Sequence, residues 1–452
     1  MAMIVKNNLG AVRTTNTLDK NEKARNKSLG KLSSGMKVTS AQDDASSFAI
    51  SERMRVRLRA LDQANQNTQN DMSMMKTAGG AVDNTVEILR ALKEKAINAA
   101  NDSNTDEDRM ILQKEAHQLI DQINDNALVQ FNGKYLINGT VNNAVSGTKT
   151  ILLNQSLSTN NIGTSTNLVD LNNRVGDSLE IKAGDLYNVS WVHNGTNYSS
   201  SGEITTSTKL YELFRMDGTK YMLGDGTIQK NIPMEDGRNK NSSQPGVAKV
   251  VTDKFGQSVY TPDKERGIAI FSAKTGPDNQ VAGFTISITD SQGNVRKDVN
   301  AALEFKLLQR GENATGDNSL SFHVGSEANV AIKVGLTDMR AHALGLESND
   351  GKKLLFVPKE NANAAINVFD NALTMSLDQA TSIGAVQQRL EHTAANLTTA
   401  SENVQAAESV IRDADMAKEM TEYTKNNVLM QAAQAMLAQA NQSSSAVISL
   451  LQ

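Results

Sequence analysis

Cysteine is absent from the whole chain of 452 residues. Its absence excludes disulfide bridges, thiolate metal sites and catalysis by a cysteine nucleophile. The amino terminus, MAMIVKNNLG, has too few consecutive apolar residues for a secretory signal, and nowhere do about 18 apolar residues follow one another. We therefore expect neither secretion directed by a cleavable signal nor insertion into a membrane.

Aromatic residues and an excess of charge of one sign are also scarce. Aromatics make up 4% of the chain, Trp191 is the one tryptophan, and the formal net charge is −4 with both signs well mixed. The core must therefore be packed mainly from alanine, leucine, isoleucine, valine and methionine. Nucleic-acid binding is not expected, because the chain has no basic field that would attract a polyanion.

Proline is missing from both ends of the chain. The five prolines lie between Pro233 and Pro358, which leaves long segments on either side free to form uninterrupted helices. Residues 54–89 and 366–411 carry mostly small or apolar residues at every third or fourth position, the spacing of a coiled-coil seam. We expect these segments to pair as a helical stem with the seam residues Leu58, Leu61, Met72, Leu390, Leu397 and Val404.

Similar repeats lie closer to the two ends. Near the amino terminus Ile4, Ala11, Leu18 and Leu32 recur in steps of seven, with Arg25 as the exception, and a three-four step runs from Leu429 to Leu450. One such stripe is typical of ordinary amphipathic packing, but four in mirror order indicate that the chain ends pair with each other. The expected assembly seam consists of Ile4, Leu18, Leu32, Leu429, Met436, Val447 and Leu450.

The pattern changes between the helical ends. The segments LEIKAGDLYNVSWVHNG, RGIAIFSA and GFTISITD alternate with period two and are separated by turn residues, which predicts short strands from about residue 141 to 340. The Asn132-Gly133 pair predicts a type I′ hairpin before this region, and TDED predicts a capped helix from Thr105. The fold class is therefore α+β: a long coiled-coil-like helical stem formed by both chain termini, with a β-rich inserted surface region.

The stretch GKLSSGMKVTSAQDDASSFAISERMR could be taken for a phosphate or metal loop. The residue types fit a helix boundary better. Gly35 suits the left-handed position after a helix, and Ser40 precedes Asp43 by three residues, the spacing of a capping box, with Asp44 in the first turn. We interpret Gly35, Ser40, Asp43 and Asp44 as a joint between two helices.

No catalytic constellation is visible. The five histidines are scattered without an HExxH spacing, and no Walker or dinucleotide-binding glycine motif occurs. The turn GDGT could hold calcium, but the same residues are frequent in plain turns. We expect no enzyme activity and no cofactor.

Both ends of the chain resemble bacterial flagellin. The resemblance is carried by LSSGMKVTSAQDDASSFAISERMR, QFNGKYLING, FHVGSEANVAIKVGLTDMRAHALGL and VLMQAAQAMLAQANQ, and covers roughly residues 1–140 and 321–452. It implies a subunit that polymerises into the flagellar filament for motility, exported unfolded by a type III channel, assembled at the filament tip and located outside the cell. The implied parts are inner core helices (1–41 plus 412–452), a helical stem with a β-hairpin (42–140 plus 341–411) and a variable surface region (141–340).

The resemblance also implies partners: further copies of the chain, an export chaperone, the filament cap and the hook-junction proteins. Similar flagellins contact a host innate receptor through an arginine, a leucine and a glutamate. The glutamate corresponds to Glu115, but the other two positions are Ala91 and Lys95. The resemblance therefore implies weakened receptor recognition.

Three other functions have to be weighed. A hook-filament junction protein has similar ends but caps a junction, and the glutamine- and alanine-rich carboxyl end favours flagellin over it. An enzyme in the inserted region would need clustered catalytic residues. A coiled-coil adhesin would be expected to carry a secretory signal.

Overall fold

The computed structural model describes residues 8–154, 156–157, 166–173, 176–216, 220–221, 235–236, 249–252, 258–260, 268–272 and 275–450. The described residues fall into two compact units. The first lies within Met1–Gln69, His323–Val330 and His392–Gln452, and the second within Asn70–Phe322 and Ala331–Glu391. Each unit is described by itself.

Long helices come from both ends of the chain, as the missing prolines predict. The helices of the described residues are α1 (Leu9–Ser34), α2 (Ala45–Ala99), α3 (Asp106–Ala127), α4 (Lys297–Ala302), α5 (Lys359–Arg412) and α6 (Met416–Leu450). The described strands are β1 (Gln130–Phe131), β2 (Lys134–Tyr135), β3 (Ile151–Asn154), β4 (Leu186–His193), β5 (Thr196–Glu203), β6 (Arg215–Met216), β7 (Lys220–Tyr221), β8 (Glu235–Asp236), β9 (Lys249–Thr252), β10 (Ser258–Tyr260), β11 (Ile268–Phe271), β12 (Val281–Thr289), β13 (Lys306–Gln309), β14 (Leu320–His323) and β15 (Ala331–Val334). Helical ends around an inserted β region confirm the α+β fold class.

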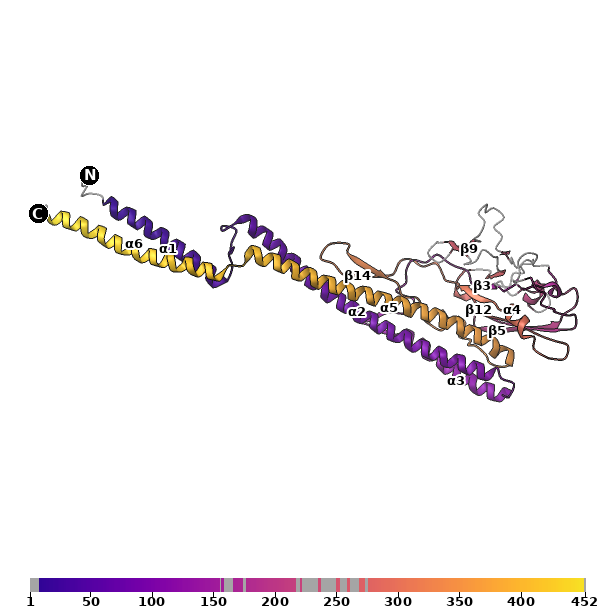
Figure 1. The fold of residues 1–452 in the computed structure, drawn as a ribbon. Coiled ribbons are helices and arrows are strands. Elements are labelled where there is room, and N and C mark those ends of the chain that lie inside the picture. Colours follow the sequence, from indigo (N-terminus) through magenta and orange to yellow (C-terminus); the bar gives the residue numbers. More distant parts are fainter. Residues whose placement is uncertain are drawn as a thin grey trace. The chain divides into compact units, whose positions relative to one another are not determined.

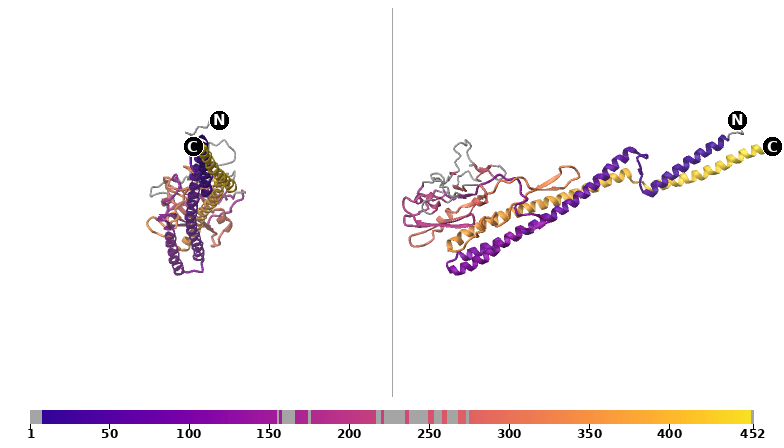
Figure 2. Two further views of the ribbon diagram at one scale, coloured as in Figure 1. Left: turned by 90° about the vertical axis from the view of Figure 1, so that its left-hand side faces the viewer. Right: turned by 180° about the vertical axis from the view of Figure 1, so that it is seen from behind.

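In the first unit, helices from opposite ends of the chain run side by side (Figure 1). Helix α1 lies along α6, and views from other directions show the same pairing (Figure 2). The start of α2 pairs with the end of α5 through a small apolar cluster of Leu61, Ala64 and Leu397. The pairing is antiparallel, because Ser51 contacts Glu408 and Asp62 contacts Ser401.

In the second unit, α2 and α5 are also paired antiparallel. The amide of Gln387 on α5 donates to the carbonyl oxygen of Met75 on α2 at 3.0 Å, and Lys93 forms an ion pair with Asp370 at 2.5 Å. Helix α3 packs against α2 as well, so α2 buries residues beyond the seam. The fully buried apolar positions of α2 here include Met75, Ala78, Val82, Leu89, Leu92, Ala96 and Ala99.

The inserted region has its own core. Strands β13, β3, β11 and β8 form one antiparallel sheet in that order, and β12, β4 and β5 form another. Trp191 and Phe284 are 1% exposed, and the rings of Phe284 and Phe305 meet edge to face at 5.2 Å. Burial alternates with period two from Phe284 to the end of β12, whereas the first residues of the strand are all buried.

Two turn predictions are confirmed. β1 and β2 pair antiparallel, with Asn132 at φ 49° and Gly133 at φ 75° in the turn between them. These positive angles are those of a type I′ turn. Helix α3 starts with a full capping box, in which Thr105 and Asp108 satisfy each other's backbone amides.

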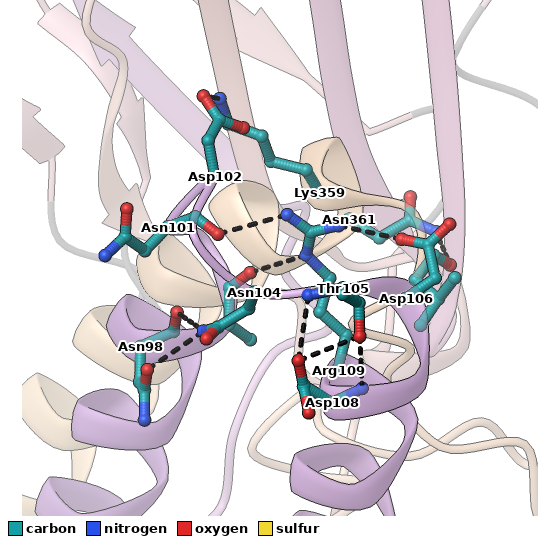
Figure 3. Close-up of polar contacts among 12 residues, drawn as sticks. Asn98, Asn101, Asp102, Asn104, Thr105, Asp106, Asp108, Arg109, Lys359 and Asn361 are labelled. Atoms are coloured by element: carbon teal, nitrogen blue, oxygen red, sulfur yellow. Dashed lines mark hydrogen bonds and ion pairs between the residues drawn. The ribbon is translucent and has the colours of Figure 1, made fainter.

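A buried arginine organises the turn from α2 to α3 (Figure 3). Arg109 is 7% exposed, and its guanidinium donates to the carbonyl oxygens of Ala99 (2.9 Å) and Asn101 (3.1 Å) and to Asp106 (2.7 Å). It therefore satisfies carbonyl groups at the carboxyl end of α2 that have no partner within the helix.

One carboxylate of α2 is poorly matched to its surroundings. The Oδ2 atom of Asp71 is buried and has no hydrogen-bond partner among the described residues. Burial raises the pKa of Asp71 to about 6, because desolvation disfavours the charged form.

We expect Arg109→Met to lower the free energy of unfolding by about 1–3 kcal/mol, because carbonyl oxygens around Ala99 would lose their donor. Thermal and urea unfolding followed by circular dichroism measure the change. The exposed Arg90 on α2 provides the matched control, and Arg90→Met should change little. Equal losses in both variants would contradict the role given to Arg109.

Asp71 should make the stability depend on pH. A carboxyl whose pKa is raised on folding contributes fully only below its unfolded pKa, and this stability is lost as the pH rises through about 6. Asp71→Asn should therefore raise the free energy of unfolding at pH 7.5 by about 1 kcal/mol, and with it the melting temperature. Near pH 4 it should leave both unchanged. A gain of the same size at both pH values would rule out the titration of Asp71 as its cause.

Candidate assembly surface and joint

The joint brings the two helix breaks of the chain together. Helix α1 ends at Ser34, and Gly35 follows in the left-handed region at φ 69°, as expected. The amide of Lys37 donates to the carbonyl oxygen of Arg412 at 2.6 Å, and that of Ala414 to the carbonyl oxygen of Gly35 at 2.9 Å. The links α1–α2 and α5–α6 are therefore bonded to each other as a short antiparallel pair.

The carboxylates of the joint bind backbone and side-chain donors, but Ser40 is not the cap that its spacing predicted. Asp44 caps α2, accepting from the amides of Ser46 (3.0 Å) and Ser47 (3.2 Å) and from the Ser47 hydroxyl (2.6 Å). Ser40 instead accepts the amide of Asp43 through its main-chain oxygen. The correction arises because α2 begins at Ala45, later than the capping-box spacing implied.

Asp43 ties the joint to α1. Its carboxylate lies 2.9 Å from the Lys27 ammonium and accepts from the amide (3.3 Å) and hydroxyl (2.9 Å) of Thr39. Hydrogen bonds from Lys27 and then from Thr39 hold the pKa of Asp43 well below its usual range. The Ser47 hydroxyl and amide likewise lower the pKa of Asp44. Both groups are therefore carboxylates at neutral pH, with their acceptor atoms already occupied by the chain.

Arg412, which no sequence motif singled out, closes the joint. It is 8% exposed, and its guanidinium donates to Ser51 (3.0 Å) and Glu52 (2.7 Å) and to the sulfur of Met36 (3.1 Å). It also lies 5.7 Å from the centre of the Phe48 ring. The hydrogen bond that Arg412 donates to Glu52 lowers the pKa of that carboxyl group. One side chain thus joins the end of α5 to the start of α2 and to the link between α1 and α2.

The interface between α1 and α6 is mainly polar. Asn8 donates to the carbonyl oxygen of Ala440, Asn21 to that of Leu429, and Lys31 pairs with Glu419 at 3.3 Å. Arg25, the exception in the seven-residue repeat, donates to the sulfur of Met430 at 3.0 Å. Leu18 and Leu32 are half-buried in this pair. The pairing therefore removes little large apolar surface from water.

Several other large apolar side chains of this helix pair are exposed. Leu429 is 42% exposed and Met436 is 59% exposed, so the interface with α1 uses neighbouring positions such as Ala433. Other large apolar side chains of α1 and α6 are exposed as well: Leu9, Val12, Leu29, Met416, Met420 and Val428. Of the other assembly-seam residues, Ile4 lies outside the described residues, and the side chains of Val447 and Leu450 are not among those described. The assembly role of the seam stays a prediction.

Helix α6 has an unusual composition after its second turn. No charged residue follows Lys425 in the sequence. Its exposed apolar residues do not gather on one stripe, since Met420, Val428 and Met436 lie on different sides of the helix. A helix that presents apolar residues all round is typically enclosed by other elements. No helix among the described residues has the length and apolar character needed to cross a membrane.

The stem seam residues lie on the paired sides of α2 and α5. Leu61, Leu390 and Leu397 are buried, and the partly buried members are Leu58, Met72 and Val404. None of the six is exposed. Their burial agrees with the coiled-coil pattern, although the paired role assigned to the whole seam stays a prediction.

The residues that correspond to the receptor contact of flagellins lie on α2 and α3. Lys95 forms an ion pair with Glu115 at 2.6 Å, while the Glu115 side chain is 56% exposed. Ala91 is half-buried on α2. The glutamate is therefore present on the surface but already neutralised by a lysine of the same chain.

The described residues offer little for catalysis or metal binding. They contain no group of three or more histidine, aspartate or glutamate side chains placed to hold a metal ion. A hollow of about 480 Å³ beside β13 and α5 is lined by Arg310, Asp378 and Gln379 among others, with no histidine in its wall.

Two family models match the ends of the chain: the bacterial flagellin N-terminal helical region over residues 5–142 and the bacterial flagellin C-terminal helical region over residues 366–451. A flagellin of Clostridium tyrobutyricum is 30% identical over 97% of this chain and 99% of its own. A flagellin of Bacillus subtilis (strain 168) is 28% identical over 99% of this chain and 100% of its own. The solved structure of flagellar hook associated protein-3 from Legionella pneumophila aligns with a TM-score of 0.31 at 15% identity, over 79% of this chain and 97% of that one.

Replacing Arg412 should loosen the joint. Arg412→Met leaves the buried Ser51 hydroxyl without one partner and removes the bond to Glu52, at a cost of about 1–3 kcal/mol. Limited proteolysis should then cut residues 35–44 faster than in the parent. Arg53→Met is the control, because Arg53 is exposed and bonds only its own helix at Ala49. Unchanged cleavage in Arg412→Met would show that Arg412 does not hold the joint.

Proposed function

The chain belongs to the bacterial flagellin family and is a structural subunit of the flagellar filament; we propose that it polymerises through the outward apolar sides of α1 and α6. The observation that carries the proposal is the absence of charge after Lys425 together with the exposure of Leu429, Met436 and their apolar neighbours on the α1–α6 pair. Exposed apolar area of this kind gains about 25 cal/mol per Å² when a second surface covers it.

The occupant of this surface is a further copy of the same chain. The α1–α6 contact is mainly polar and leaves Leu429, Met436 and other large apolar side chains exposed, so one subunit does not bury them by itself. In a tube, each α6 can be enclosed by helices of several neighbours, which suits a helix with apolar residues all round. The inner core helices would then be residues 1–41 plus 412–452, with Gly35 to Asp44 and the facing break at Arg412 as the joint to the stem.

The other parts would have separate tasks. Residues 42–140 plus 341–411 would form the stem, and residues 141–340 the variable outer surface. A separate core around Trp191 and Phe284 supports this division, since it needs no residue of the α1–α6 pair. We further propose, on family grounds, export of the unfolded chain, assembly at the filament tip outside the cell, and contacts with an export chaperone, the filament cap and the hook-junction proteins.

Recognition by a host innate receptor is proposed to be weak. Glu115 is exposed, but Lys95 neutralises it and occupies the position at which related flagellins offer a leucine. A receptor surface that needs a free carboxylate and an apolar neighbour would find neither here.

The proposal is tested with the double variant Leu429→Asp, Met436→Asp. Parent subunits added to short seed filaments should elongate them in electron micrographs. The double variant should not, because each new carboxylate would be buried between subunits without a partner. Sedimentation of the polymer gives the amount assembled.

The matched control is Val295→Asp in the inserted region, where Val295 is 56% exposed. It also places a carboxylate at an exposed apolar position, and it should elongate seeds like the parent. Elongation by the double variant would refute the α6 surface. Parent subunits that block seeds without lengthening them would favour the alternative of a hook-filament junction protein.

A further inference from the structure

Exposed methionine is concentrated on α6. Four methionines are exposed among the residues whose burial is described, and three of them, Met416, Met420 and Met436, lie on this helix, 47%, 48% and 59% exposed. The fourth, Met110, lies on α3. The chain contains no cysteine that could react with an oxidant before these thioethers do.

The three sulfurs differ from others in the same unit. The sulfur of Met36 accepts a hydrogen bond from Arg412 at 3.1 Å, and that of Met430 accepts one from Arg25 at 3.0 Å. Both of those side chains are half-buried. No hydrogen bond to sulfur is found for Met416, Met420 or Met436 within the described part of the chain, and the three side chains are about half exposed.

Methionine suits an interface between subunits for a reason that also makes it vulnerable. Its unbranched side chain adapts to irregular gaps in apolar packing. Oxidation turns the thioether into a polar, chiral sulfoxide that no longer fits such a gap. A residue that is exposed before assembly and buried after it is open to oxidation only in the free subunit.

We propose that Met416, Met420 and Met436 form a peroxide-sensitive modification site, at which oxidation of the free subunit blocks its addition to the filament. The inference rests on the proposed assembly surface of α6. In the reaction, a sulfur lone pair attacks one oxygen of hydrogen peroxide, the O–O bond breaks, and a sulfur–oxygen bond forms. Sulfur is oxidised, the peroxide is reduced, and the second oxygen leaves as water.

The order of oxidation gives the first test. Free subunits are treated with dilute hydrogen peroxide, and peptide mass spectrometry measures sulfoxide at each methionine over time. We expect Met416, Met420 and Met436 to react first, Met36 and Met430 more slowly, and the fully buried Met75 last. In assembled filaments the three α6 residues should be protected by about tenfold or more. Equal rates in subunit and filament would overturn the proposal.

The second test links oxidation to assembly. Oxidised parent subunits should need about a tenfold higher concentration to elongate seeds, since a polar group would be buried in the interface. The triple variant Met416→Leu, Met420→Leu, Met436→Leu keeps the apolar volume without the sulfur and should elongate seeds equally well before and after peroxide. Met110→Leu is the matched control and should stay as sensitive as the parent.

Enzymatic reduction gives a result that does not depend on the variants. Methionine sulfoxide reductases acting on both epimers should restore elongation by the oxidised parent. Undiminished elongation by oxidised parent subunits, loss in the triple variant equal to that in the parent, or no recovery after reduction would each overturn the inference. These outcomes leave the assembly surface intact, whereas elongation by the Leu429→Asp, Met436→Asp variant refutes the surface itself.

Discussion

Helices α2 and α5 come from opposite halves of the chain, and each needs the other to remove its seam from water. The contacts Ser51–Glu408, Asp62–Ser401 and Lys93–Asp370 show one antiparallel pairing within the respective units. Because the pairing joins residues hundreds of positions apart, everything between them is a closed loop whose entropic cost grows only slowly with its length. A large β region can therefore be carried between the helices without weakening their pairing much.

The joint shows how two helix breaks can supply each other with main-chain hydrogen bonds. Gly35 follows the end of α1, and Asp44 caps the start of α2. The break after Arg412 forms main-chain hydrogen bonds with the link between these two helices. A helix end leaves several amides and carbonyls without partners. When two helix breaks lie next to each other, amides of each break can donate to carbonyl oxygens of the other. The hydrogen bonds of Arg412 to Ser51 and Glu52 then hold the two breaks together.

Features that depend on local spacing could be predicted from the sequence, and features that depend on partners could not. The heptad pattern predicted buried Leu61, Leu390 and Leu397, and Asn132-Gly133 predicted its hairpin, because periodicity and backbone preference act within a few residues. The prediction that Ser40 caps α2 was wrong. Ser40 and Asp44 both suit a helix start, and only the residue at which α2 begins decides between them. The bonds of Arg109 to Ala99 and Asn101, those of Arg412, and the ion pair of Lys95 with Glu115 join residues that no regular sequence spacing relates.

The composition of α6 has to avoid both premature association and the burial of charge. A helix without charge after Lys425 but richer in leucine would associate before it reached the filament, and a charged one could not be enclosed by neighbours. Alanine, glutamine, asparagine and serine between Leu429, Met436 and the other exposed apolar residues keep the surface broken into small patches. Each patch gains little by itself, so only contacts with several neighbours at once exceed the entropy lost on association. On the proposed assembly surface, addition of a subunit would then be favoured where a filament end already presents several such neighbours together.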